Sequence, residues 1–405
     1  MPGDDAFPAL TPHLRALRDR YSAFMEEYVY PNERALSADD DASDELIAEL
    51  RARAVEAGLW APHIGPEAGG TGGGFLSYAF LNEVIGRSYW GQLVFGCQAP
   101  DAGNSEILHT FGTPEQRRRW LAPLVAGELR SFFGMTEPEV SGADPTSLES
   151  RAVQDGDEWV IDGHKWFSTG ADGAAFGIVM AVTDPGEEPH RRASLIIVPA
   201  DMPGVEVVRN IEVFGHTGRG WNSHGEVRLR NVRVPAENLL GGRGEGFSIG
   251  QRRLGPGRIH HAMRWLGQMQ RAFDLMCSYS LRRSAFGGPL ADKQAIQTWI
   301  ADSAAEISAC RLMTLDAAAK IDRGEQARVE VSALKFYSAQ VLHTVIDRAI
   351  QTHGALGVSG DSPLAEMYTN ARFARIYDGP DEVHRMVVAR KILETYRAGD
   401  AWSFE

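Results

Sequence analysis

The spacing of apolar residues changes twice along this 405-residue chain and divides it into three segments. From about residue 11 to 130, apolar side chains recur three and four positions apart, which predicts amphipathic helices. From about 131 to 242 the period falls to two in several short runs without intervening helices, which predicts an antiparallel β-barrel or sandwich. From about 246 the helical spacing returns and indicates packed bundle helices. We therefore expect a mainly α protein with a central β domain, comprising an N-terminal helical domain (1–130), a middle β domain (131–245) and a C-terminal helical bundle (246–405).

Two local signals refine this division. Asp155-Gly156-Asp157 lies between two alternating runs and predicts a hairpin turn. Near the start of the last segment, Pro256 lies between two glycines, which predicts a chain break with the proline in the first turn of a long helix.

The composition excludes several classes of partner and of binding site. There are 41 Lys and Arg against 54 Asp and Glu, a net charge of −13, so nucleic acid or an anionic membrane is not the expected partner. The three cysteines, Cys97, Cys277 and Cys310, are far apart and odd in number, which argues against a disulfide framework or a zinc cluster and favours a reducing cytoplasm. No apolar run approaches the ~20 residues that span a bilayer. The 43 glycines and the ordinary fraction of charged residues predict a cytoplasmic enzyme without a metal site or an integral membrane segment.

Two stretches of the β segment could bind a flat heteroaromatic ring. Residues 132–138 place the hydroxyl of Thr136 and backbone donors beside aromatic and thioether groups. In residues 163–170, Phe167 and Thr169 would share one face of a strand and could flank one ligand, since alternate side chains point the same way. An ordinary turn and an aromatic strand packed into the core remain the alternatives.

Two stretches of the last segment could bind a nucleotide. In the run 282–287, an arginine (Arg282 or Arg283) could pair with a pyrophosphate while Phe286 covers an adenine. The small residues of 351–357 would let backbone approach another group closely. The alternatives are a solvated basic face and a helix C-cap with a left-handed glycine.

A turn at residues 376–384 carries three carboxylates beside Tyr377. Asp381 could simply cap the following helix. A carboxylate held in an apolar pocket could instead act as a base.

These five stretches, in this order and at these separations, resemble the flavin-dependent acyl-CoA dehydrogenase family over about residues 11–398. The runs at 135–140, 254–261 and 377–384 are most similar to the subgroup of vertebrate family members ten and eleven and their bacterial relatives. The resemblance implies a C-terminal four-helix bundle and FAD as the cofactor, bound without a Rossmann fingerprint.

The resemblance also implies the cofactor contacts. The flavin ring would meet the β segment at Phe133, Met135, Thr136, Phe167, Ser168 and Thr169. The diphosphate and adenine would be held across a subunit interface by Arg283, Phe286, Gln294, Gln351, Gly354, Ala355 and Gly357, with further contacts at Pro380 and Glu382. The enzyme would then be at least a homodimer, and a homotetramer is common in the family.

The catalytic base implied by the resemblance is Asp378, where most relatives place Glu and the nearest subgroup has Asp. Acyl-CoA would contact Ser141, Arg258, Tyr377 and Gly379. The implied reaction, a step of fatty acid β-oxidation, removes the α-proton of the thioester and transfers a hydride to flavin N5, giving trans-2-enoyl-CoA. Electron-transfer flavoprotein would be the electron acceptor.

Two other functions stay open. A flavin oxidase similar to the nitroalkane oxidases would also use an aspartate base. A non-catalytic homologue that binds acyl-CoA is the other alternative.

Overall fold

The computed structural model describes residues 10–403, which divide into two compact units. The first contains residues up to 34 together with 73–92 and 257–403, and the second contains 35–72 and 93–256. The second unit thus combines helices from the N-terminal segment with all the strands of the middle segment. The division into three domains predicted above stays a prediction.

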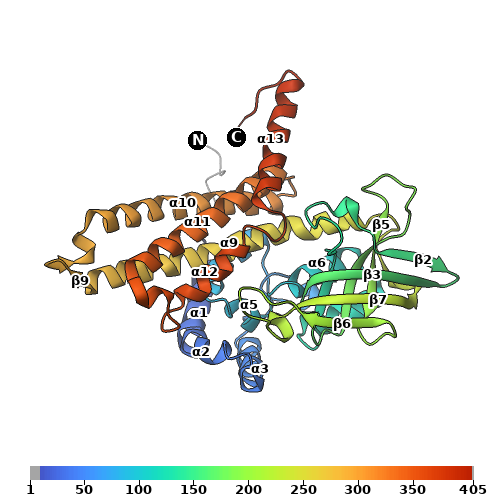
Figure 1. The fold of residues 1–405 in the computed structure, drawn as a ribbon, viewed down its shortest axis with the longest axis horizontal. Coiled ribbons are helices and arrows are strands. Elements are labelled where there is room, and N and C mark those ends of the chain that lie inside the picture. Colours follow the sequence, from blue (N-terminus) through green and yellow to red (C-terminus); the bar gives the residue numbers. More distant parts are fainter. Residues whose placement is uncertain (1–9, 404–405) are drawn as a thin grey trace. The chain divides into compact units, whose positions relative to one another are not determined.

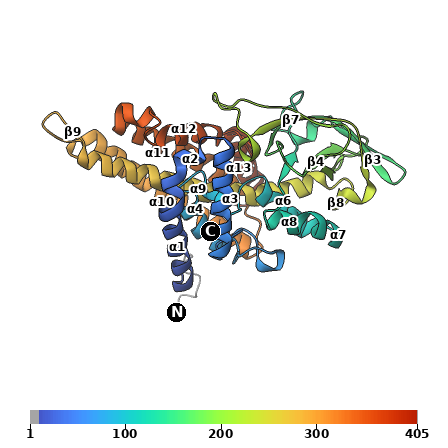
Figure 2. The same cartoon turned by 90° about the horizontal axis from the view of Figure 1, so that it is seen from below.

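The first unit is helical. In Figures 1 and 2, its long helices α9, α10 and α11 run alongside one another, and α11 also contacts α12 and α13. The helices are α1 (Pro12–Phe24), α4 (Phe75–Ile85), α9 (Gly246–Arg282, which begins in the second unit), α10 (Gln294–Asp322), α11 (Arg328–His353), α12 (Leu364–Phe373) and α13 (Asp381–Arg397). A short hairpin, β9 (Ser284–Ala285) with β10 (Gly288–Pro289), joins α9 to α10.

The predicted chain break at Pro256 is wrong, because Pro256 lies inside α9. Proline lacks one N–H and so removes one hydrogen bond of a helix interior. The ten residues that precede Pro256 and the 26 that follow it continue the helix on both sides. The division between the two units falls directly after this proline.

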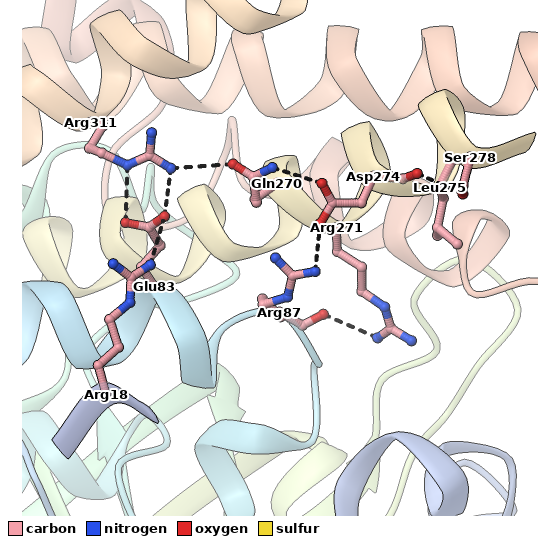
Figure 3. Close-up of polar contacts among 9 residues, drawn as sticks. All are labelled: Arg18, Glu83, Arg87, Gln270, Arg271, Asp274, Leu275, Ser278 and Arg311. Atoms are coloured by element: carbon pink, nitrogen blue, oxygen red, sulfur yellow. Dashed lines mark hydrogen bonds and ion pairs between the residues drawn. The ribbon is translucent and has the colours of Figure 1, made fainter. Parts of the chain in front are cut away.

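A network of charges ties four helices of the first unit together (Figure 3). Glu83 of α4 is buried and accepts two hydrogen bonds from Arg311 of α10, at 2.5 and 3.1 Å. Arg18 of α1 lies 3.5 Å from the same carboxylate. Two arginines therefore neutralise one buried glutamate.

The network continues along α9. Gln270 accepts from Arg311 at 3.4 Å and donates to Asp274 at 2.9 Å. Asp274 also accepts from Arg87 at 2.7 Å, and the carbonyl of Arg87 accepts from Arg271. These contacts connect α9 to the residues that follow α4 (Figure 3).

The second unit contains an eight-stranded sheet and several helices. The order of the sheet is β6-β7-β3-β2-β4-β5-β8, with β1 added beside β4. The strands are β1 (Ser131–Gly134), β2 (Arg151–Asp155), β3 (Glu158–Thr169), β4 (Phe176–Val182), β5 (Ala193–Pro199), β6 (Val205–Asn210), β7 (His224–Pro235) and β8 (Leu239–Leu240). Its helices are α3 (Asp41–Glu56), α6 (Asp101–Phe111), α7 (Pro114–Gln116) and α8 (Ala122–Val125); the short α2 (Glu33–Leu36) and α5 (Gly91–Val94) cross the division between the units.

The predicted fold class is confirmed, and the sheet differs from the expected antiparallel barrel or sandwich in two ways. It is open, with β6 and β8 at its ends. It is also mixed, because β1 and β2 pair with β4 in parallel while the other pairs are antiparallel. The predicted hairpin is present: Asp155 pairs with Glu158, and Gly156 turns the chain with a φ of +62°.

Alternation along the strands gives the sheet a continuous apolar core. Its buried members include Phe132, Trp159, Ile161, Val179 and Val227. In the described part of the chain, no helix has the length and apolar character needed to cross a membrane.

Candidate active site

The loop that carries Asp378 connects α12 to α13 in the helical unit and is held through its backbone carbonyls. Lys335 of α11, fully buried, donates to the carbonyls of Ala374 at 2.8 Å and Gly379 at 3.1 Å. The carbonyl of Asp378 itself accepts from Arg258 Nε at 2.9 Å and from His384 Nε2 at 3.1 Å. Asp378 adopts a φ of +51°, a left-handed conformation that costs a non-glycine residue energy and persists where the surroundings impose it.

The Asp378 carboxylate has a neutral histidine as its partner. His261 Nε2 lies 2.7 Å from Asp378 Oδ2, and the guanidinium of Arg264 contacts His261 Nδ1. An arginine can only donate, so Nδ1 accepts and the proton is on Nε2, which donates to the carboxylate. Burial, with Arg264 nearby, lowers the pKa of His261 to about 3, which keeps the ring neutral. The Asp378 side chain is 25% exposed, so its carboxylate is anchored and still accessible.

Aromatic rings surround this pair. The rings of Tyr377 and His261 lie 4.5 Å apart, and Trp265 Nε1 donates to the Tyr377 hydroxyl at 3.1 Å. Lys335 Nζ lies 5.4 Å from the centre of the Tyr377 ring and 5.5 Å from that of Trp265. Burial raises the pKa of Tyr377, so its hydroxyl stays protonated.

The other carboxylates of this turn have structural partners or face solvent. Asp381 is buried and pairs with Arg375 at 2.8 Å, and Gln340 donates to the same oxygen at 3.1 Å. Asp381 is the first residue of α13, whose N-cap is Pro380 without a side-chain cap bond. Glu382 is exposed.

In the sheet unit, a buried ion pair brings the two predicted flavin stretches together. Lys165 Nζ lies 2.6 Å from Glu137 Oε1 and donates to the carbonyl of Met135 at 3.1 Å. The N–H of Trp166 donates to the carbonyl of Thr136 at 3.1 Å. Met135 and Thr136 therefore lie beside the last part of β3.

Beside them, β3 carries a bulge that turns an aromatic ring outward. The register against β7 shifts between Lys165 and Ser168, and Phe167 has a φ of +48° and is 44% exposed. The bulge interrupts the alternation of side chains along β3. The prediction that Phe167 and Thr169 share one face depended on that alternation. Both nevertheless lie beside His224: its ring centre is 6.2 Å from that of Phe167, and its Nδ1 is 2.9 Å from Thr169 Oγ1.

The predicted Ser141 lies in a segment that contacts Thr136. Ser141 is exposed, and the next residue, Gly142, approaches Thr136 so closely that a Cβ on it would lie 2.5 Å from Thr136 Cγ2. Phe133 has the guanidinium of Arg253 over its ring at 4.1 Å. The structure thus brings Thr136 together with the segment of Ser141 and, through Trp166, with the end of β3.

The predicted nucleotide residues lie at one end of the long helices. Phe286, in the β9–β10 hairpin, is 99% exposed with a φ of +50°, and Arg283 is also exposed. Gln294 begins α10, and Gly354 is the C-cap of α11. Its φ of +62° and ψ of −136° differ from the left-handed helical geometry that the alternative interpretation expected. His353 stacks on Tyr279 of α9 at 4.2 Å, which brings residues 351–357 to the helix that leads into the hairpin.

The other residues of that loop face outward or pack closely. Gln351 and Ala355 are exposed, whereas Gly357 is buried, and a Cβ on it would lie 2.7 Å from the Ile350 carbonyl. Sequence reasoning gave no role to Lys335 or Lys165, and it placed His261 only within the run 258–261 that could line the acyl pocket. The contact of His261 with Asp378 was not predicted, although His261 follows Arg258 by three residues and so lies on the same face of a helix.

Comparisons with known proteins identify the family. Sequence profiles of the acyl-CoA dehydrogenase N-terminal, middle and C-terminal domains match residues 11–128, 132–232 and 244–393. The chain is 45% identical to the probable acyl-CoA dehydrogenase FadE2 of Mycobacterium tuberculosis, covering 93% of this chain and 94% of that protein. It is 42% identical to acyl-CoA dehydrogenase family member 10 of Mus musculus, over 95% of this chain and 37% of that longer protein.

The fold comparison agrees. The solved structure of an acyl-CoA dehydrogenase homologue from Mycobacterium abscessus superposes with a TM-score of 0.90 at 41% identity, covering 96% of this chain and all of that one. The chain is therefore an enzyme of the oxidoreductase class, and it belongs to the acyl-CoA dehydrogenase family. The predicted resemblance, including the subgroup of family members ten and eleven, is confirmed.

FAD, the predicted cofactor, agrees with family membership. The residues present fit such a group. Ser168 Oγ is buried and has no hydrogen-bond partner within the described residues, next to the outward ring of Phe167. An aromatic surface beside an unsatisfied hydroxyl is what a flat ring with polar edges requires.

Proposed function

We propose that the protein catalyses the α,β-dehydrogenation of an acyl-CoA thioester and that Asp378 removes the α-proton. The observation that carries this proposal is the placement of Asp378: a partly exposed carboxylate on a left-handed backbone, fixed from Arg258, His261 and His384. A general base must keep its carboxylate in one position relative to the proton it removes. Aspartate is one methylene shorter than glutamate, so its carboxylate reaches less far. The contacts that fix its position are therefore more important here.

The protein's own residues prepare the proton transfer. Arg258 holds the backbone of the base, and its pKa is lowered by burial against the opposing effect of Asp378. Tyr377 and Trp265 pack against His261, the partner of the carboxylate, while Gly379 gives the loop its turn with a φ of +101°. When bound, FAD supplies the hydride acceptor.

We assign the cofactor contacts as the sequence predicts them. The residues that would meet the flavin are Phe133, Met135, Thr136, Phe167, Ser168 and Thr169. The fully exposed ring of Phe286 supports an assembly in which the nucleotide end of FAD is shared with a second copy of the chain, because such a ring gains from being covered. Arg283, Gln294, Gln351, Gly354, Ala355, Gly357, Pro380 and Glu382 would complete that part.

The remaining details belong to the same proposal. Ser141 would lie near the thioester, and electron-transfer flavoprotein would accept the electrons in fatty acid β-oxidation. The three cysteines are free thiols, which supports a cytoplasmic location.

The test is an anaerobic visible spectrum of the FAD-loaded protein during titration with butyryl-, octanoyl- and palmitoyl-CoA. Bleaching of the flavin band with one chain-length class, and formation of the corresponding enoyl-CoA, is the expected result. A band that never bleaches, or rapid hydrogen peroxide production in air, would instead favour an oxidase. Absence of FAD after purification and reconstitution would favour a non-catalytic homologue.

A further inference from the structure

One side chain contacts the base differently from the others that hold its loop. Lys335, Arg258 and His384 all donate to backbone carbonyls, of Ala374, Gly379 or Asp378. His261, in contrast, donates to the carboxylate of Asp378, at 2.7 Å. Bonds to the backbone fix where the loop lies, whereas only a bond to the carboxylate restricts rotation of the Asp378 side chain.

The orientation of His261 is itself fixed. Its side chain is 10% exposed, and its ring stacks on Trp265 at 5.7 Å and lies 4.5 Å from that of Tyr377. Arg264, one turn later on α9, donates to Nδ1 and so selects the tautomer with the proton on Nε2. The charged and titratable groups facing the ring are Arg264 on α9, Lys335 on α11, and Tyr377 and Asp378 on the loop.

We propose that His261 is a positioning residue of the catalytic base: Arg264 fixes its tautomer, and its Nε2–H holds Oδ2 of Asp378 so that the carboxylate stays in one plane. The inference rests on the proposed function. During α-proton removal, the C–H bond breaks, the proton passes to the Asp378 carboxylate and the bonding electrons stay on the substrate, where they become part of the α,β double bond. His261 keeps its own proton throughout. A donor that is neutral and does not exchange its proton stabilises the carboxylate without competing for the substrate proton.

The experiment compares the FAD-loaded wild type with His261→Leu and His261→Gln. A glutamine amide reaches the position of Nε2 and can donate to Oδ2, whereas leucine cannot. The rate of flavin bleaching is measured anaerobically by stopped flow at saturating acyl-CoA, with unlabelled and α-deuterated substrate. The substrate is whichever of butyryl-, octanoyl- or palmitoyl-CoA reduces the wild type.

We expect His261→Leu to bleach about 100-fold more slowly, because a small misplacement of a reacting group has an effect of this order. The half-saturating substrate concentration should change little, and the α-deuterium isotope effect should rise because proton removal limits the rate more strongly. His261→Gln should recover to within about tenfold of the wild type. A merely structural role would not produce this pattern of an isotope effect and rescue by glutamine.

His260→Gln is the matched control. His260 is the preceding residue of α9 and is also buried. It stacks on Phe75 of α4 at 5.0 Å and meets Tyr78 of α4 edge-on at 4.9 Å. It should bleach like the wild type. If His261→Leu does not fold, His261→Asn replaces it, since the asparagine amide ends near the position of Nδ1; equal rates for Asn and Gln would overturn the inference.

The outcomes separate this inference from the proposed function. Wild-type rates and isotope effects in His261→Leu overturn the role of His261 and leave the dehydrogenase intact. A wild type that no acyl-CoA reduces overturns the dehydrogenase, and the role of His261 with it.

Discussion

Lys165 and Glu137 form an ion pair in which both side chains are buried, with Nζ 2.6 Å from Oε1. The carboxylate also accepts from the N–H groups of Glu149 at 2.7 Å and Ser150 at 3.0 Å. Burial alone would raise the pKa of Glu137, but Lys165 and these donors hold it below its usual value. The pair joins β3 to the chain that follows β1, and the proposed flavin residues lie on both sides of it.

Replacing Lys165 with Met should therefore lower the free energy of unfolding by about 3–5 kcal/mol, because it leaves a buried carboxylate without its cation. Urea unfolding followed by circular dichroism measures the change. Arg230→Met removes an exposed ion pair with Glu206 on the same sheet and should cost less than about 1 kcal/mol. Equal costs for the two variants would contradict the importance assigned to the buried pair.

Glu83→Gln should destabilise the helical unit by about 2–3 kcal/mol. The substitution removes the charge that neutralises Arg311 and Arg18 at the contact of three helices, and partial exposure of the arginines reduces the effect. Glu49→Gln, in an exposed pair with Arg53, is the control and should cost less than about 1 kcal/mol. A Glu83→Gln variant as stable as this control would refute the prediction.

The start of α4 is capped from a distant part of the sequence. Asp322, the last residue of α10, accepts from the N–H groups of Phe75 and Leu76, each at 2.8 Å. Asp322→Ala leaves both N–H groups to solvent and should cost about 1 kcal/mol, while Asp322→Asn, which keeps an acceptor, should cost less. Thermal unfolding of the three proteins tests this order, and a neutral Ala variant would contradict it.

We expect the protein to lose stability in acid, because two buried histidines are harder to protonate in the folded chain than in the unfolded chain. Burial, with Arg258 and Lys335 nearby, lowers the pKa of His384 to about 4, and burial lowers that of His261 to about 3. In the unfolded chain both return to about 6.5, so the unfolded chain binds more protons below that pH. The free energy of unfolding should therefore fall between about pH 6.5 and pH 4, by about 1.4 kcal/mol per pH unit for each histidine.

Urea unfolding at pH 7, 6 and 5 measures this slope. His384→Gln should flatten it, whereas the same substitution at the exposed His13 should leave it unchanged. Identical slopes in all three proteins would show that His384 does not contribute.

Most of the fold class could be predicted from the local spacing of apolar residues. The change from helical to alternating spacing near residue 131, and the turn at Asp155-Gly156-Asp157, depend on residues close in sequence, and both appear where they were predicted. The parallel pairing of β1 with β4 joins Ser131 to Phe176 and had no local signal. Pro256 was misplaced because the helical residues on both sides outweigh the one hydrogen bond that proline removes.

The candidate site was predictable in its motifs and not in its supporting contacts. The 376–384 turn is visible in the sequence, but His261 reaches Asp378 from 117 positions away and Lys335 reaches Gly379 from 44. Such contacts depend on how the helices pack. The bulge that turns Phe167 outward arises from the pairing of β3 with β7, so alternation within β3 alone could not predict it.

The most direct test of the central claim is substrate reduction of the FAD-loaded Asp378→Asn variant, followed anaerobically in the visible spectrum. Asparagine keeps the size of the side chain and cannot accept the α-proton as a base, so we expect FAD to remain bound and the rate of bleaching to fall by about 100- to 10,000-fold. Asp361→Asn, an exposed site in the same unit, should bleach like the wild type. Bleaching of Asp378→Asn at the wild-type rate would contradict the assignment of Asp378 as the base.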